Sequence, residues 1–165
     1  MSIPLYIHLS IHLLLSLLAG AIAWRIWKKP LLSLSGAILG GFLIDLDHFI
    51  DYFLAFGWNF NYFYFIKGYE FLKTDKMYIF FHGWEYVFVL LMLLLILKNK
   101  NAKSLCLALA LALFFHLVSD VFMDKVSPKS YFVILRAEKN FDLKKIVTPE
   151  HWEKHLKYKK KINFE

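Results

Sequence analysis

Long apolar stretches constrain this chain more than any other feature of its sequence. Four of them approach the roughly 20 residues that a membrane-spanning helix needs, at about 3–27, 31–56, 77–97 and 104–122. Hydrophobic residues make up 59% of the chain, against roughly 45–50% in soluble domains, so a soluble core of this size could not bury them all. The sequence therefore predicts an all-α membrane protein in which residues 1–124 form a bundle of four transmembrane helices.

Residues 125–165 have a different composition and predict a basic interfacial tail. They contribute much of the net charge of +7. Within them, 148–161 is typical of a helix with Thr148 as N-cap and Pro149 at its first position, whereas 130–136 fits a short strand or an interfacial segment. No nucleic-acid motif accompanies the charge, so the expected partners are membrane lipids with anionic phospholipid headgroups, and no specific nucleic acid.

Two further features concern the membrane boundary and helix packing. The connection 57–77 is rich in Trp, Tyr and Phe, and aromatic residues at this density are typical of the headgroup layer. Gly36 and Gly40 lie four residues apart in the second apolar run, so we expect a neighbouring helix to approach closely there.

Ionisable residues inside the apolar runs all fall toward one side of the predicted bundle. In an up-and-down arrangement, the starts of the first and third helices and the ends of the second and fourth lie together. The ionisable residues occupy those parts of the runs, with Asp124 just beyond them: His8, His12, Asp45, Asp47, His48, Asp51, His82, Glu85, His116 and Asp120. Such groups are expensive in apolar surroundings, so their convergence predicts a functional site.

The spacing within each run supports a shared site. His8 and His12 are four residues apart, as are His116 and Asp120, which places each pair on one helix face. If the second helix is regular, Asp45 points about 160° away from Asp47 at roughly 100° per residue, so the two cannot both bind one ion directly.

Imidazole and carboxylate donors together predict a divalent metal centre. The only cysteine, Cys106, lies in an apolar run and reads as a packing residue; without thiolates, zinc or manganese fits best. The donors exceed what one tetrahedral ion uses, which favours a dinuclear site. The predicted ligands are His8, His12, Asp47, His48, Asp51, His82, His116 and Asp120, with Asp47 or Asp51 bridging. Glu85 or Asp45 is the predicted general base, or orients a ligand histidine.

Each element also has a purely structural interpretation. His8 alone could be a hydrogen-bonding residue between helices, Asp124 could be an ordinary solvated carboxylate, and Glu85 could simply hydrogen-bond to His82. A polar network without any ion would explain the whole set, but an accidental scatter would place some acids in the other leaflet.

Four motifs occur in an order that resembles a known family: "HLLLS" (12–16), "GGFLIDLDHFIDYF" (40–53), "FFHGWEY" (80–86) and "FFHLVSDVFMDKVSPKSY" (114–131). Together they resemble the small prokaryotic inner-membrane proteins described as membrane-bound metal-dependent hydrolases, which are distantly similar to zinc-dependent phospholipase C. The resemblance spans residues 8 to about 135. The third block departs from the family pattern of His-Arg-Gly followed by Thr-His-Ser: the arginine is missing, and Glu85 stands near the position of the second histidine.

The predicted function is a membrane-embedded metal-dependent hydrolase that uses metal-activated water on a lipid or lipid-linked headgroup, a phosphoester before an acyl ester. One alternative is a metal-ion or proton transporter, although the far halves of the runs offer only scattered serines to a conduction path. Another is a non-catalytic membrane binding protein acting through its tail. The basic tail favours an inner-membrane protein with the site and both termini on the cytoplasmic side.

Overall fold

The computed structural model describes residues 5–162 and is helical in all its regular elements, with no β-strand among those residues. The chain divides into two compact units. The first, unit 1, comprises Met1–Asp45 and Phe81–Lys125, and the second, unit 2, comprises Leu46–Phe80 and Val126–Glu165. An all-helical membrane fold was expected from the apolar runs, whereas the division of the chain differs from the predicted boundary after residue 124.

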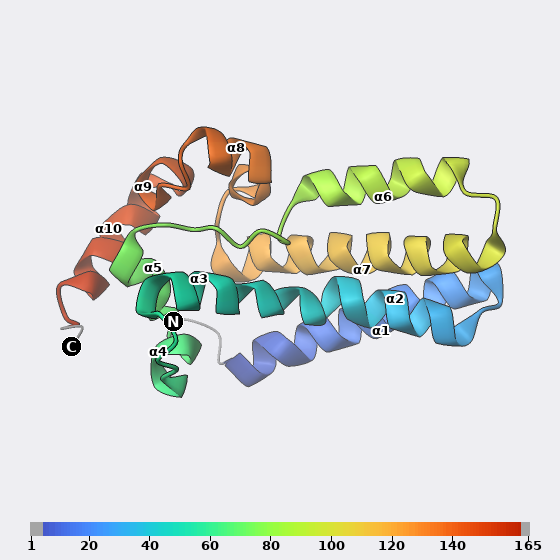
Figure 1. Cartoon of the computed structure of the whole chain (residues 1–165), viewed down its shortest axis with the longest axis horizontal. Helices are drawn as coiled ribbons and strands as arrows, with labels where there is room; N and C mark the ends of the chain where they lie inside the picture. The colour runs from blue at the N-terminus through green and yellow to red at the C-terminus, as the bar shows by residue number, and fades with distance from the viewer. Residues whose placement is uncertain (1–4, 163–165) are drawn as a thin grey trace. The chain divides into compact units, whose positions relative to one another are not determined.

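Unit 1 is built around its longest helix, α7 (Lys100–Asp124). Helices α1 (Leu5–Trp27), α2 (Pro30–Gly41) and α6 (Trp84–Ile96) all pack against α7, and α1 also packs against α2 (Figure 1). Short turns join α1 to α2 and α6 to α7, so each of these pairs runs antiparallel.

Small residues let these helices approach closely. The buried core of unit 1 contains Ala19, Ala37 and Ala108. A methyl group added at Gly36 would lie 2.5 Å from the Leu105 carbonyl oxygen, and one at Gly40 would lie within 2.6 Å of the next turn of α7. The close approach predicted at the two glycines is therefore confirmed, and α7 is the helix that approaches them.

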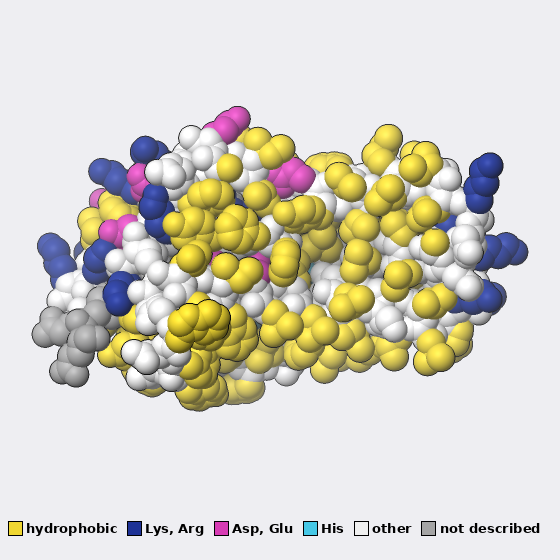
Figure 2. Space-filling view, in the orientation of Figure 1, with side chains coloured by type: hydrophobic (Ala, Val, Ile, Leu, Met, Phe, Trp, Pro, Cys, Tyr) yellow, Lys and Arg dark blue, Asp and Glu magenta, His cyan; other side chains and the backbone are white. Residues whose placement is uncertain are grey.

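The outer surface of unit 1 is apolar along its length and basic at the end that carries the two short turns. In Figure 2, hydrophobic side chains cover its helices and Lys and Arg gather at those turns, where Lys28, Lys29, Lys98 and Lys100 are exposed. Among the described residues, α1 and α7 are each long and apolar enough to cross a membrane. A third span results if Pro30–Gly41 and Leu43–Phe56 are counted as one interrupted crossing. The molecule therefore has the character of a membrane protein, with two or three candidate spans.

The third predicted span is shorter in the structure than in the sequence analysis. Helix α6 has 13 residues and begins at Trp84 instead of Met77, which is too short for a crossing of roughly 20 residues. The residues before it are not helical because their backbone amides bind elsewhere. Tyr78 N and Ile79 N each donate to a different oxygen of the Asp51 carboxylate at 2.8 Å, so they cannot close helical hydrogen bonds.

Unit 2 consists of short helices from both of its segments. The first segment forms α3 (His48–Phe56), α4 (Tyr62–Ile66) and α5 (Tyr69–Thr74). The second forms a 3₁₀ turn, η2 (Pro128–Tyr131), and the helices α8 (Val133–Glu138), α9 (Leu143–Ile146) and α10 (Pro149–Lys159). The strand alternative for 130–136 is thus wrong. The terminal helix is confirmed, with the Thr148 hydroxyl accepting from His151 N as its N-cap.

The basic tail packs onto the rest of unit 2 through backbone and side-chain contacts. Leu143 N donates to the Asp75 carbonyl oxygen at 2.9 Å, and an antiparallel bridge joins Lys76 to Asp142. His155 and Lys159 of α10 reach the Asp75 carboxylate at 2.7 and 2.6 Å. These bonds join the residues after 125 to the segment 46–80 within unit 2.

Candidate metal centre

Four histidines and two aspartates of unit 1 meet in one buried cluster. The cluster contains three groups of three residues, and within each group the donor atoms lie within 4.8 Å of one another and could hold a metal ion. They are His8–His12–Asp120, His12–Asp45–His116 and His82–His116–Asp120. The structure therefore brings together six of the residues predicted from the sequence, and we call these six the metal cluster.

Asp120 is the carboxylate at the middle of the metal cluster. Its Oδ1 lies 3.1 Å from His12 Nε2 and 3.6 Å from His8 Nε2, both on α1. Its Oδ2 lies 3.1 Å from His116 Nε2 and 3.8 Å from His82 Nε2. One carboxylate thus presents a separate oxygen to each of two histidine pairs, which is the arrangement of a bridging ligand between two ions.

The two histidine pairs face each other nitrogen to nitrogen. His8 Nε2 and His12 Nε2 are 2.7 Å apart, and His82 Nε2 and His116 Nε2 are 3.0 Å apart. Two imidazole lone pairs repel at this distance, so each pair needs either an N–H that one ring donates to the other or a metal ion between the nitrogens. Two nitrogens bound to one tetrahedral zinc ion at about 2.0–2.1 Å would be roughly 3.3–3.4 Å apart, which small ring rotations would supply.

The Nδ1 atoms of His116 and His12 each lie beside a hydrogen-bond acceptor, which places a proton on Nδ1 in both rings. His116 Nδ1 lies 2.9 Å from the Gly41 carbonyl oxygen, which can only accept, so Nδ1 carries the proton and donates. The Ser119 hydroxyl has one proton and donates it to the His116 carbonyl at 2.8 Å. The same hydroxyl, 3.2 Å from His12 Nδ1, must therefore accept from that nitrogen. In the neutral form of each ring, the nitrogen that faces Asp120 is then an unprotonated Nε2, which is the tautomer that metal-ligating histidines use.

Asp45 joins the metal cluster because the second apolar run is not a regular helix. The backbone tightens into a 3₁₀ turn, η1 (Leu43–Asp47), directly after α2, so the angular reckoning for a regular helix does not hold there. Asp45 Oδ1 lies 3.3 Å from His82 Nε2 and 3.4 Å from His116 Nε2. Its side chain is 22% exposed, against 5% for Asp120. Asp45 is therefore a ligand candidate that also retains access from outside.

Glu85 and Asp124, two other acids of unit 1, lie outside the three donor groups of the metal cluster. Glu85 is partly exposed in the first turn of α6, and Asp124 is exposed at the last residue of α7. The exposure of Asp124 fits the solvated carboxylate considered in the sequence analysis. The role of Glu85 as a general base stays a prediction.

The other predicted ligands belong to unit 2. Asp47 is fully buried there, and the His48 ring packs edge to face on Phe71 at 5.8 Å between centroids; their roles as ligands stay predictions. Asp51 has both carboxylate oxygens engaged by the backbone amides of Tyr78 and Ile79. These contacts give Asp51 a structural role, and its role as a metal ligand stays a prediction.

Arg136 is a buried residue that the sequence analysis left among the charges of the tail. Its side chain is fully buried, and its guanidinium donates to the carbonyl oxygens of Ser130 and Ile79, both at 2.9 Å. The backbone of Ile79 thus binds Asp51 through its amide and Arg136 through its carbonyl. The signal that could have revealed this role is the position of Arg136 in the apolar stretch 131–137.

Glu70 is a second buried acid of unit 2, only 2% exposed. Burial raises the pKa of its carboxyl to about 8; its own backbone amide opposes the shift, and the nearby Asp51 charge adds to it. Glu70 is therefore mostly protonated at neutral pH, and unit 2 avoids burying a further negative charge.

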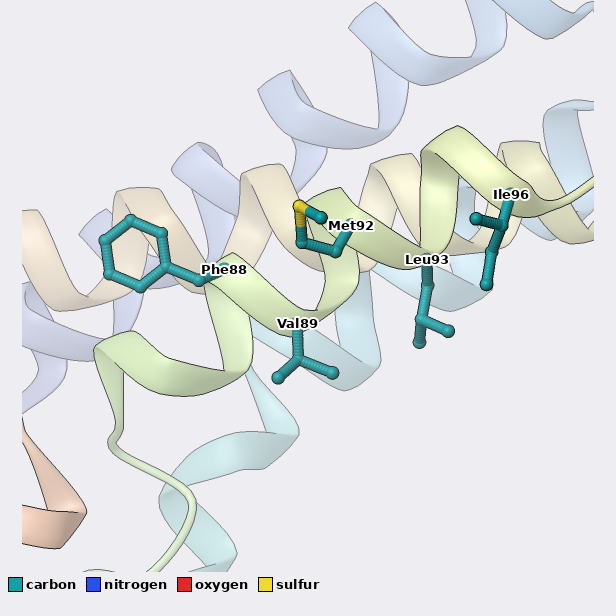
Figure 3. A pocket seen from close by; sticks show the side chains of 5 residues that line it. All are labelled: Phe88, Val89, Met92, Leu93 and Ile96. Carbon is teal, nitrogen blue, oxygen red and sulfur yellow. The ribbon is translucent and has the colours of Figure 1, made fainter.

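A surface hollow of unit 1 offers no chemistry of its own. It lies on α6 and is lined by the exposed side chains of Phe88, Val89, Met92, Leu93 and Ile96 (Figure 3). None of these side chains is titratable, so the hollow contributes no acid, base or metal ligand.

Comparison of the chain with protein-family models, with curated proteins and with solved structures found no match.

Proposed function

We propose that this protein is a membrane-embedded metal-dependent hydrolase that acts on a lipid or lipid-linked headgroup, a phosphoester in preference to an acyl ester. The observation that carries the proposal is the position of Asp120, whose two oxygens face two separate histidine pairs. Such symmetry is what a pair of ions needs and what a structural hydrogen-bond network does not require.

The donor set favours zinc, with manganese as the second choice. Every donor in the metal cluster is an imidazole nitrogen or a carboxylate oxygen, and these ligands suit both ions. Four histidines and two aspartates are enough for a dinuclear centre in which Asp120 is shared. A divalent ion held there would supply Lewis acidity and lower the pKa of a water to near neutrality.

The residues of the chain have separable tasks in this proposal. His8 and His12 hold one side of the centre, and His82 and His116 hold the other. Asp45 is the more exposed of the two carboxylates in the metal cluster, so it is the group that can accept a proton from a water beside the substrate. Gly41 and Ser119 act on the rings of His116 and His12 and keep their Nε2 atoms directed inward.

The surroundings support a lipid substrate. The helices that carry the metal cluster have apolar outer faces and include both long candidate spans, so a lipid diffusing in the bilayer reaches the protein without leaving the membrane. The basic residues of the chain suit an anionic phosphate headgroup. We place the site and both termini on the cytoplasmic side, which a C-terminal phosphatase or fluorescent-protein fusion would test.

The test combines metal content with lipid turnover in the purified full-length chain. Elemental analysis should find bound zinc or manganese, and Asp120→Asn and His116→Ala should each lose most of it. His151→Ala is the matched control, because this histidine lies on α10 in unit 2. Metal-loaded wild type should cleave a phospholipid in a membrane-extract screen. Retention of full metal content by both site variants would overturn the metal centre, and zinc flux into liposomes without lipid turnover would favour a transporter.

A further inference from the structure

A group of large aromatic side chains is held outward between α3 and α4 in unit 2. Trp58 is 91% exposed, and Phe60, Tyr62 and Phe63 are also exposed. We call these four residues the aromatic platform. Single exposed apolar residues are common on proteins, but four neighbouring aromatic residues form the kind of patch that marks an interaction surface.

The backbone beneath the aromatic platform is fixed by the buried Tyr52. Its hydroxyl accepts from Asn61 N at 2.8 Å and donates to the Asn59 carbonyl oxygen at 3.2 Å. The side chain of Asn61 then caps α4 by accepting from Tyr64 N. The loop is therefore clamped at two successive points, so the exposure of Trp58 is built into the fold.

Ring stacking adds a second support. Phe49 of α3 stacks on Phe65 of α4 with 4.3 Å between centroids and also contacts Phe60 at 5.8 Å. Phe53 contacts Trp58 at 5.3 Å. The platform thus rests on an inner layer of rings, and its outer faces remain available to a partner.

The charge around the aromatic platform identifies the chemistry of that partner. Residues 52–69 contain no acid, and their one charged residue is Lys67. The ammonium of Lys67 lies 5.7 Å from the centre of the Phe63 ring, and that of Lys73 lies 4.5 Å from the Phe56 ring. Aromatic rings with lysines beside them and no carboxylate suit the boundary between acyl chains and anionic headgroups.

We propose that the aromatic platform inserts into the interface of the lipid bilayer and anchors unit 2 at headgroup depth. Trp and Tyr combine an apolar ring with a polar tip, which favours this layer over the acyl core and over water. The chain enters the platform directly from Leu43–Phe56, the second half of the interrupted candidate span, so a membrane lies within reach of the segment. The inference does not depend on hydrolase activity.

Spin-label accessibility tests the depth of the aromatic platform directly. Cys106 is the only cysteine, so Cys106→Ser provides a background in which Trp58→Cys and Tyr62→Cys carry one label each. Two matched controls are Glu138→Cys, at an exposed site of α8, and Leu14→Cys, at an exposed site of α1. The full-length protein is reconstituted in bilayers of phosphatidylethanolamine and phosphatidylglycerol, and collision rates with oxygen and with a water-soluble nickel reagent are measured.

Labels at Trp58 and Tyr62 should be several-fold less accessible to nickel than the Glu138 label, and less accessible to oxygen than the Leu14 label. That intermediate depth is the signature of the interface. Nickel accessibility equal to that of the Glu138 label would place the platform in water and overturn the proposal. Dipolar broadening between labels, with low accessibility to both reagents, would show that a second copy of the chain covers it. Because the two labels are tested separately, misfolding of one variant leaves the other to decide.

Discussion

Replacing Ser119 with alanine tests the claim that the chain prepares His12 to bind a metal. In the wild type the hydroxyl accepts the Nδ1 proton of His12 and leaves Nε2 unprotonated toward Asp120. Without the hydroxyl, the metal-free protein can move that proton to Nε2, where His8 Nε2 accepts it at 2.7 Å. In the metal-bound protein the proton cannot move to Nε2, because Nε2 then binds the metal. The proton therefore stays on Nδ1, which has no hydrogen-bond partner in the variant.

The size of the effect follows from the burial of His12. Its side chain is fully buried, and a buried donor that loses its partner costs about 1–3 kcal/mol. Because this cost falls on the metal-bound state alone, it subtracts directly from the binding free energy. Zinc affinity should therefore fall roughly 5- to 150-fold, at about 1.4 kcal/mol for each factor of ten.

Competition with a chromophoric chelator would measure the zinc affinity, and the ¹⁵N shifts of the imidazole would report which ring nitrogen carries the proton. Ser119→Thr keeps the hydroxyl and should recover most of the affinity. Ser16→Ala is the matched control, since this buried α1 serine donates to the His12 backbone carbonyl and touches neither ring nitrogen. The reasoning is refuted if Ser119→Ala binds zinc as tightly as the wild type, or if Ser16→Ala weakens binding equally.

Three further predictions concern packing and charge. Gly36→Ala should lower the free energy of unfolding by about 1–3 kcal/mol, because its methyl group would meet the Leu105 carbonyl at 2.5 Å. Gly20→Ala is the comparison, since its nearest contact is a side-chain carbon at 3.1 Å, and thermal unfolding should show a smaller loss of stability for it. The raised pKa of Glu70 means that the folded protein holds a proton that the unfolded chain releases, so stability should fall as pH rises from 4.5 to about 8; Glu70→Gln should flatten that slope, and an unchanged slope would count against it. Burial alone would raise the pKa of the Asp75 carboxyl, but hydrogen bonds from Lys159 and His155 outweigh burial and lower it. The contribution of Asp75 to stability is therefore present above its ordinary pKa of 3.8 and is lost as pH falls below that value, where amide exchange in α10 should accelerate. At neutral pH, Asp75→Asn should accelerate the same exchange to a smaller extent, because its amide still accepts hydrogen bonds.

The membrane character and most of the metal cluster could be predicted because both follow from simple spacing. Apolar runs of sufficient length identify α1 and α7, and a four-residue repeat places His8 with His12 and His116 with Asp120 on single helix faces. Up-and-down connectivity then brings the starts and ends of the helices together. Neither inference needs knowledge of a side-chain rotamer.

The predictions from hydropathy and helical periodicity were wrong where the backbone departs from a regular helix. Residues 77–83 have the apolar composition of a helix, but the Asp51 carboxylate binds two of their amides, which therefore cannot form helical hydrogen bonds. The 3₁₀ turn at Leu43–Asp47 interrupts the second apolar run, so the angles of a regular helix do not apply to Asp45. Hydropathy and periodicity describe side chains, so they do not register competition for backbone hydrogen bonds.

The groups that surround the buried carboxylates differ between the two units, and this difference favours a metal site in unit 1 only. In unit 2, backbone amides bind Asp51, the fully buried Arg136 supplies a positive charge beside it, and Glu70 is largely protonated. In unit 1, the carboxylate of Asp120 faces four imidazoles whose nitrogens approach one another within 3.0 Å in each pair. Neutral imidazoles leave the carboxylates of Asp120 and Asp45 without a positive charge, which either protonated rings or divalent cations would supply. Divalent cations would satisfy the carboxylate and both histidine pairs at once, which is why we expect bound metal at the metal cluster.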